Sequence, residues 1–416
     1  MTRTIHIIGA GLAGLAAAVD LASRKETVVV HEATSVAGGR CRSYHDHSIG
    51  MTIDNGNHLL LSGNRAALGY LQTIGANDRL VGPPAVEFPF FDFANRERWT
   101  LRFNAGRLPW WIFGRGRRVP GSRAADYLPM APLLWASRDK TVAEVIRLEG
   151  IVYERLVRPL LLAALNLDPP GASAALAGAI IRETLAAGGS ACRPLIAREG
   201  LSQAFIEPAL GYLAQHNAVV RFDHQLHAFH FVDRTVGALD FGRDSVMPAP
   251  DDAVILAVPP YAAASLVPAL ATPNAYSAIV NAHFRIETAA HLPPILGVLN
   301  ATSEWLFALP GRLSVTISAG DRLIDVPRES LAQTIWQEVA AILGLSCALP
   351  PWQIVRERRA TFAATPEQDA RRPPARTRWA NLALAGDWTD TGLPATIESA
   401  IRSGRRAAEL VSRSEM

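Results

Sequence analysis

A glycine-rich turn near the start of the chain is the feature that most constrains its fold. The motif Gly9-Ala10-Gly11-Leu12-Ala13-Gly14 follows the apolar run Thr4–Ile8 and opens a run of mostly small and apolar residues, Leu12–Ser23. In a βαβ unit the first glycine allows a tight turn, the second lets a diphosphate approach the backbone, and the third lets strand and helix pack closely. The free N–H groups at the helix N-terminus favour the negative charge of that diphosphate. The turn therefore predicts a dinucleotide site.

The next segment supports this prediction. The apolar run Thr27–His31 is followed by Glu32 and Ala33, and Glu32 lies 18 positions after the last glycine of the motif. At that distance a carboxylate can accept hydrogen bonds from the ribose hydroxyls. Gly38-Gly39-Arg40 follows, with glycines that allow close backbone approach and an arginine fork that suits phosphate. Alone, this tripeptide would be an ordinary loop, but its place after Glu32 favours a cofactor contact.

The other end of the chain carries a second signal. The apolar run Leu382–Ala385 ends at Gly386-Asp387, where a carboxylate can hold a ribityl or phosphate group of an extended cofactor. We expect a helix to begin near Pro394-Ala395-Thr396, with Pro394 in its first turn. Its N-terminus could stabilise the negative charge of a reduced flavin at N1 and C2=O, although a helix that only packs the domain would give the same pattern. The dinucleotide is therefore predicted to be a flavin.

Together these motifs resemble the flavin-containing amine oxidase and phytoene desaturase superfamily. More narrowly, the chain resembles the squalene-associated flavoproteins that dehydroxylate hydroxysqualene in bacterial hopanoid synthesis. The segments that carry the closer resemblance are Asp54-Asn55-Gly56-Asn57-His58-Leu59-Leu60-Leu61, Ala163-Ala164-Leu165-Asn166 and Thr396–Gly404. Residue 57 is Asn where that family is expected to have Gln.

The resemblance implies an α/β fold: a Rossmann-like FAD-binding domain of the amine oxidase type, with an inserted mixed-sheet substrate domain and a helical cap. The expected FAD domain is discontinuous and comprises residues 1–62, 212–262 and 376–416. The expected substrate domain comprises residues 63–211 and 263–375. Non-covalent FAD is expected, because no cysteine follows Cys347 to attach a flavin near the C-terminal helix.

The resemblance also implies a reaction and further contacts. Asn55, Gly56, Asn57 and the backbone of Leu226 are expected to contact FAD. Reduced flavin would deliver hydride from N5 to an allylic carbon as hydroxide leaves, and a general acid should help this poor leaving group. His58 is the expected acid, although a structural histidine bonded to backbone is an equal alternative. Asp54 could also donate a proton, but Asp is more often a turn-forming residue.

Other functions remain open from the sequence. A carotenoid-type desaturase would use the same motifs in the oxidative direction, and a small-amine oxidase would need an aromatic cage that cannot be assigned. A non-catalytic lipid-binding relative would have a degraded nucleotide site, whereas the motifs here are intact. The partners expected are the hydrophobic isoprenoid hydroxysqualene and an unidentified electron donor for FAD.

Length, net charge and cysteine content limit the number of domains, the partners and the compartment that we expect. A length of 416 residues predicts two or three domains, and a net charge of +3 gives no reason to expect nucleic-acid binding. The three cysteines have no metal-ligand spacing, so we expect no metal site and a reduced, cytoplasmic compartment. We expect no signal peptide, because the first predicted strand begins at Thr4. No uninterrupted apolar run reaches the ~20 residues of a membrane-spanning helix.

Residues 107–118 combine Trp110 and Trp111 with several arginines. This composition suits a peripheral contact with the inner membrane, with aromatics among the headgroups and arginines near anionic lipid. The alternative is a turn of the cap whose tryptophans are core residues. Among the remaining segments we expect strands at 219–222, 226–232 and 253–258 and a helix at 330–343. Residues 371–374 are interpreted as a linker.

Overall fold

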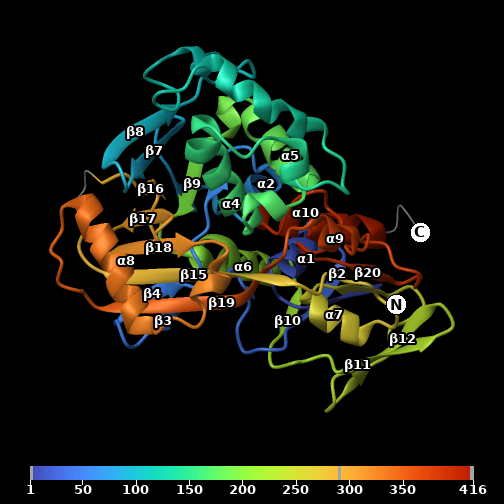
Figure 1. The fold of residues 1–416 in the computed structure, drawn as a ribbon. Coiled ribbons are helices and arrows are strands. Elements are labelled where there is room, and N and C mark those ends of the chain that lie inside the picture. The colour runs from blue at the N-terminus through green and yellow to red at the C-terminus, as the bar shows by residue number, and fades with distance from the viewer. Residues whose placement is uncertain (1–2, 289–291, 413–416) are drawn as a thin grey trace.

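The computed structural model describes residues 3–288 and 292–412 (Figure 1). Its first layer is a five-stranded parallel sheet in the order β10-β2-β1-β14-β20. Because these strands come from three distant stretches of sequence, the chain returns twice to the domain that it opens. The strands are β1 (Thr4–Ile8), β2 (Thr27–His31), β10 (Val219–Arg221), β14 (Ala253–Leu256) and β20 (Leu382–Leu384).

The two faces of this sheet are covered by different layers. Ile5 and Ile7 of β1 pack with the helices α1 (Leu12–Ser23), α6 (Glu207–Gln215) and α10 (Ile397–Val411). Ile8 points to the opposite face, as the two-residue period of a strand requires, and packs in a cluster that includes a small three-stranded sheet. That sheet is antiparallel and contains β11 (Ala228–Val232), β12 (Thr235–Asp240) and β13 (Ser245–Val246).

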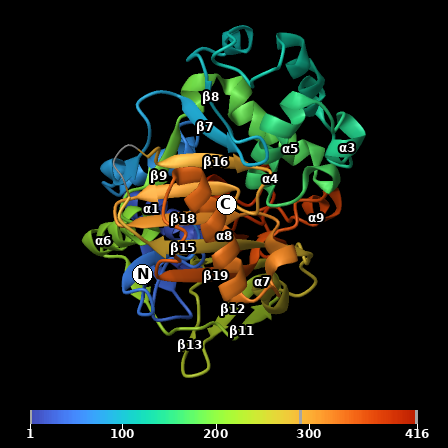
Figure 2. The same cartoon turned by 60° about the vertical axis from the view of Figure 1, so that its left-hand side comes forward.

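A seven-stranded mixed sheet, called the second sheet below, forms the second half of the molecule. Its strand order is β19-β15-β18-β17-β16-β7-β8. On one face, Val280 and Phe284 of β15 pack against α8 (Arg328–Leu343), which crosses the sheet (Figure 2). The alternate residues Asn281 and His283 occupy the other face, which turns toward the first domain. The strands are β7 (Glu87–Asp92), β8 (Glu97–Arg102), β15 (Tyr276–Arg285), β16 (Ile295–Leu299), β17 (Trp305–Leu309), β18 (Arg312–Ile317) and β19 (Trp352–Phe362).

A helical cap covers the apolar end of the second sheet. Its α-helices are α3 (Val142–Val145), α4 (Arg158–Leu165) and α5 (Ala174–Glu183), which are short and separated by 3-10 turns, chiefly η2 (Trp110–Phe113) and η3 (Ala124–Trp135), and by a π-helical turn at Tyr153–Val157. A second π-helical turn, Ser202–Ile206, leads into α6, and α2 (Arg65–Thr73) packs with α1 and α10 in the core of the first domain. Smaller elements complete the fold: β3 (Ser43–Asp46), β4 (Met51–Asp54), β5 (Leu60–Leu61), β6 (Leu80–Val81), β9 (Pro194–Ala197), α7 (Pro260–Leu266) and α9 (Pro366–Ala370).

The α/β class is confirmed, whereas several local expectations are wrong. The C-terminal helix begins at Ile397, so Pro394 lies before it rather than in its first turn. The strand expected from residue 226 begins at Ala228, since Leu226 lies in the connection that precedes it. Residues 371–374 are not a solvated linker, because the Arg372 side chain is buried against neighbouring loops. The strand at 219–222 ends one residue early, and the expected helix at 330–343 begins at Arg328.

Candidate cofactor site

The glycine motif forms the turn from β1 into α1, and its three glycines have distinct surroundings. Gly9 has φ +105°, and a Cβ atom there would lie 2.6 Å from the Ala257 carbonyl oxygen. A Cβ at Gly14 would lie 1.9 Å from the Gly9 carbonyl oxygen, so this glycine lets helix and strand touch. A Cβ at Gly11 would meet no atom within 4 Å. The middle glycine therefore borders open space at a helix N-terminus, which fits a diphosphate.

Glu32 stands at the end of β2, directly beside this turn. Its Oε2 accepts a hydrogen bond from the Ala10 N–H at 2.7 Å, and its Oε1 accepts one from the Thr34 N–H at 3.0 Å. The connection after β10 lies alongside, because the His224 N–H donates to the Glu32 carbonyl oxygen at 2.9 Å. This contact brings the segment that contains Leu226 near the acidic residue, while Leu226 itself is buried and Ala33 is exposed.

Residues 38–40 join the two ends of the chain. The Gly38 N–H donates to the Ala10 carbonyl oxygen at 2.8 Å, and a Cβ on Gly39 would lie 3.4 Å from the Cα of Gly11. The Arg40 guanidinium donates to Asp387 Oδ1 at 2.7 Å and to the Ala360 carbonyl oxygen at 2.5 Å. The arginine expected to face a phosphate is thus paired with the carboxylate of the C-terminal motif.

The loop after β20 is fastened to α10. Ser403 Oγ accepts a hydrogen bond from the Gly386 N–H at 2.8 Å, and Ser399 Oγ donates to the Asp387 carbonyl oxygen at 3.3 Å. Thr396 is the N-cap of α10, because its Oγ1 accepts from the Ser399 N–H at 3.1 Å. The tripeptide 394–396 therefore places a capped helix start next to this loop, with Pro394 and Ala395 just outside the helix.

Residues 54–58 cross the polar face of the seven-stranded sheet. The Asn57 N–H and side-chain amide donate to Asn281 Oδ1 at 3.3 and 3.4 Å, and the amide also donates to Thr316 Oγ1 at 3.1 Å. Asn281 Nδ2 is buried without a hydrogen-bond partner and would lie 3.2 Å from a Cβ at Gly56. Asn55 donates to Glu357 at 3.3 Å. These contacts fix the path of the segment that carries His58.

The two candidate proton donors differ in their surroundings. Burial lowers the pKa of His58 to about 4; the charges of Asp54 and Asp387 oppose this shift, while Arg40 adds to it. Its imidazole is therefore neutral near pH 7. Asp54 pairs with the buried Arg312 at 3.2 Å and also accepts hydrogen bonds from the Ser43 hydroxyl and the Leu201 N–H. Asp54 is thus committed to the protein framework.

Three framework residues had no assigned role in the sequence analysis. Asn166 bonds Ser277, Thr361 and Ala319 and so ties the end of α4 to the second sheet. Glu398 accepts from the Ala66 and Ala67 N–H groups at the start of α2 and pairs with Arg402. Arg372 bonds Asp369 and the carbonyl oxygens of Thr389 and Asp387. Asn166 and Glu398 lie in the segments of closer resemblance, but their partners lie as far as 332 positions away.

The βαβ unit, the open space at Gly11 and the joined ends of the chain are the features of a dinucleotide-binding fold, which here is joined to a separate mixed sheet. The chain belongs to the family of flavin containing amine oxidoreductases, whose model matches residues 12–412. The superfamily expected from the sequence is therefore confirmed, and the protein is a flavin-dependent oxidoreductase.

Individual relatives extend this assignment. The chain is 58% identical to a hydroxysqualene dehydroxylase of Rhodopseudomonas palustris, over 99% of both chains. It is 56% identical to a hydroxysqualene dehydroxylase of Sinorhizobium fredii, over 99% of this chain and 98% of that protein. Among solved structures, cyclohexylamine oxidase from Brevibacterium oxydans superposes with a TM-score of 0.71 at 17% identity, over 99% of each chain. This last likeness concerns the fold.

Proposed function

We propose that this protein removes the hydroxyl group of hydroxysqualene reductively to give squalene, with non-covalently bound FAD. The observation that carries the proposal is the 58% identity with a hydroxysqualene dehydroxylase along nearly the whole chain. When bound and reduced, the flavin supplies a hydride. In the overall reaction the substrate carbon would exchange its C–O bond for a C–H bond, the hydroxyl would leave with a proton as water, and the two electrons would come from the reduced flavin.

The proposed FAD contacts lie in several segments that the fold brings together. The diphosphate fits the open side of Gly11, the adenosine end fits the neighbourhood of Glu32, and the ribityl and ring end fits the loop near Asp387. The proposed contacts are Gly9, Gly11, Leu12, Ala13, Gly14, Glu32, Ala33, Gly38, Gly39, Arg40, Asn55, Gly56, Asn57, Leu226, Gly386, Asp387, Pro394, Ala395 and Thr396. Non-covalent binding is supported by the buried thiols of Cys41 and Cys192, whose raised pKa values disfavour the reactive thiolate.

His58 is the proposed proton donor at the leaving oxygen. Its ring is neutral, because burial lowers its pKa to about 4 against the opposing charges of Asp54 and Asp387, and a neutral ring can donate an N–H hydrogen bond to that oxygen. Asp54 is not proposed for this role, because it already has three partners. Asn281 and Thr316 act through Asn57, since their bonds fix the backbone next to His58.

The apolar part of the second sheet suits an isoprenoid. Phe90, Trp305 and Phe307 lie on its inner face and belong to one buried cluster with Leu161 and Leu165 of α4. We propose the domain division expected from the sequence: residues 1–62, 212–262 and 376–416 hold FAD, and residues 63–211 and 263–375 hold the substrate. Hydrocarbon side chains on both the sheet and the cap would solvate the polyene without directional bonds.

Two partners complete the proposal. An electron donor must restore reduced FAD after each turnover, since every turnover consumes one hydride. Residues 107–118 are proposed to make peripheral contact with the inner membrane, into which a substrate of this kind partitions. No helix in the described part of the chain is long and apolar enough to cross a membrane.

The test is an anaerobic incubation of purified protein with reduced FAD and hydroxysqualene, followed by mass spectrometry. We expect squalene with reduced flavin and none with oxidised flavin. His58→Gln should lower kcat while leaving FAD bound, and His45→Gln, on the exposed β3–β4 hairpin, is the matched control. If the protein binds FAD that can be reduced and yet makes no squalene, the proposal fails. A carotenoid-type desaturase would then be tested with oxidised FAD and phytoene.

A further inference from the structure

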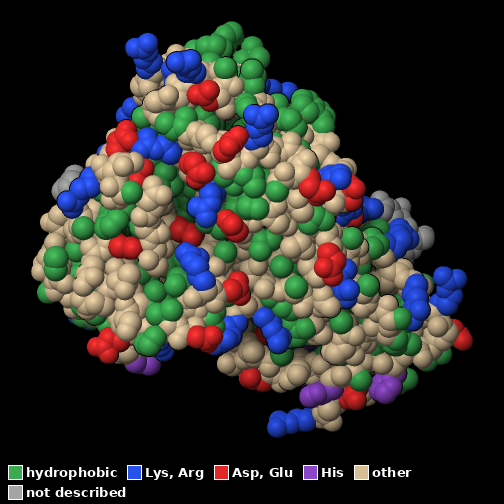
Figure 3. Space-filling model, in the orientation of Figure 1, with side chains coloured by type: hydrophobic (Ala, Val, Ile, Leu, Met, Phe, Trp, Pro, Cys, Tyr) green, Lys and Arg blue, Asp and Glu red, His purple; other side chains and the backbone are tan. Residues whose placement is uncertain are grey.

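Two neighbouring turns of the cap expose large apolar side chains. Trp110, from η2, is 64% exposed, and Leu128 and Trp135, from η3, are 68% and 78% exposed. Leu108 and Phe113 are also exposed, and the Trp110 and Phe113 rings lie 6.0 Å apart. These five residues are called the cap patch. Apolar atoms gather at the top of Figure 3, over the part of the chain drawn in teal in Figure 1.

The cap patch rests on a rigid base. Trp111 is buried and meets the Tyr127 ring edge-on at 5.2 Å, which joins η2 to η3. The Tyr127 hydroxyl accepts a hydrogen bond from the Val119 N–H at 3.0 Å. A Cβ on Gly178 of α5 would lie 2.0 Å from the Leu133 carbonyl oxygen, so η3 lies directly against that helix. The outward side chains are therefore presented by an ordered surface rather than by a loose loop.

The charges in the segment that carries the cap patch are mostly positive. Residues 102–135 contain six arginines and a single acidic residue, Asp126. Asp126 accepts a hydrogen bond from the Arg123 N–H at 2.7 Å. Arg107, Arg115 and Arg117 are exposed beside the apolar side chains. Apolar and aromatic side chains ringed by arginines complement the interface of an anionic bilayer, where aromatics lie at headgroup depth and arginines meet lipid phosphates.

We infer that the cap patch is a membrane-docking surface formed jointly by η2 and η3, and that it binds anionic lipid bilayers. The second segment adds the exposed Leu128 and Trp135 to the apolar surface that residues 107–118 offer. The role of docking rests on the proposed function, because an isoprenoid substrate would reach the protein from the lipid.

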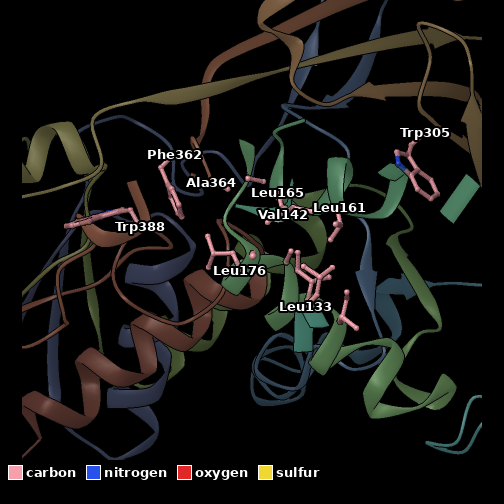
Figure 4. Packing of buried hydrophobic residues seen from close by; sticks show 14 of the residues in the cluster. Leu133, Val142, Leu161, Leu165, Leu176, Trp305, Phe362, Ala364 and Trp388 are labelled. Atoms are coloured by element: carbon pink, nitrogen blue, oxygen red, sulfur yellow. The ribbon is translucent and has the colours of Figure 1, made fainter. Parts of the chain in front are cut away.

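Buried residues link this surface to the flavin loop. Leu133 of η3 belongs to one apolar cluster with Leu176, Phe362 and Trp388, and Trp388 directly follows Asp387 (Figure 4). Docking through the cap patch would place the membrane at the end of the molecule that carries the cap. The opposite end carries β11 and β12, far from the cap in Figure 1.

The test is co-sedimentation with vesicles of phosphatidylcholine alone or mixed with phosphatidylglycerol. The full chain should bind the anionic vesicles more strongly, and added salt should weaken binding. The double variant Trp110→Ser, Trp135→Ser should bind about tenfold more weakly. The control, Val232→Ser with Met247→Ser, removes two equally exposed apolar residues near the opposite end and should bind like the unchanged protein.

Several outcomes would overturn the inference: no binding of the unchanged protein to anionic vesicles, or equal binding by the cap variant, or equal loss in the control. Light scattering tests whether a second copy of the chain binds the cap patch instead of lipid. A dimer that dissociates in the cap variant would assign the surface to that second copy. Circular dichroism of both variants separates loss of binding from loss of fold. Vesicle binding involves no turnover, so this inference and the proposed function can fail independently.

Discussion

The crossing of α1 and α10 gives the sharpest stability prediction. The two helices meet at Gly404, where a Cβ atom would lie 2.1 Å from the Ala13 carbonyl oxygen and 3.0 Å from the Ala17 nitrogen. Both neighbours are helix backbone and cannot rotate away. Gly404→Ala should therefore push the helices apart by about 1 Å, the distance needed to restore ordinary contact.

The magnitude follows from two opposing effects. Overpacking a tight contact by one methyl group costs about 1–3 kcal/mol, and a backbone neighbour favours the upper end. Replacing glycine by alanine inside a helix gains about 1 kcal/mol. The net loss for Gly404→Ala should be about 2 kcal/mol in the free energy of unfolding. Gly211, in α6, is the matched control: its Cβ would meet nothing within 4 Å, so Gly211→Ala should gain about 0.5–1 kcal/mol.

Urea unfolding followed by circular dichroism measures both variants against the unchanged protein. The same measurements with saturating FAD should show a larger loss for Gly404→Ala, because α10 also carries the Ser399 and Ser403 hydroxyls that hold the 386–391 loop. If Gly404→Ala unfolds at the same urea concentration as the unchanged protein or above it, the helix contact is not as tight as described. If Gly211→Ala is also destabilising, the propensity argument fails.

Three further predictions concern charge and the cofactor. Arg372→Met leaves the buried Asp369 short of its closest cation and should cost about 3–5 kcal/mol of unfolding free energy; a loss below about 1 kcal/mol in urea unfolding would show that Arg372 is not a structural tie. Burial and neighbouring charges lower the pKa of His31 to about 3, so it stays neutral in the fold but gains a proton in the unfolded chain below about pH 6.5. The protonation of His31 in the unfolded chain therefore leaves the free energy of unfolding unchanged above pH 6.5 and lowers it by about 2 kcal/mol at pH 5. His31→Gln should flatten the pH dependence of stability, and an unchanged slope refutes this. Glu32→Gln should raise the Kd for FAD about tenfold, measured by flavin fluorescence, and an unchanged Kd would exclude an ionic contact there.

Much of the first domain could be predicted because its signals are local. A strand, a glycine turn, a small-residue helix and a second strand follow one another within 29 residues, and β1 and β2 lie where the apolar runs predict them. The helix Arg328–Leu343 could also be predicted, over residues 330–343, because its apolar residues recur with the period of an α-helix. The cap was harder to predict, because its short 3-10 and π turns carry no long period.

Several site features depend on contacts that no local pattern encodes. Trp110 and Trp111 are neighbours in sequence, yet Trp110 points to solvent and Trp111 is buried, because Asn104 Oδ1 accepts from the Trp111 N–H and Tyr127 packs on its ring. Both interpretations of residues 107–118 were therefore partly right about burial: one tryptophan is core and the other is surface. Composition could not separate them.

The flavin family, the α/β class and the glycine turn after β1 could all be predicted from the sequence, because each depends on short motifs whose geometry is local. The tertiary structure alone decided that Arg40 pairs with Asp387, 347 positions away, and that Asp54 is held by the buried Arg312. It also decided that His58 lies where burial lowers the pKa of its imidazole to about 4. Desolvation and ion pairing depend on what surrounds a side chain in space, and that is fixed only when distant segments pack together.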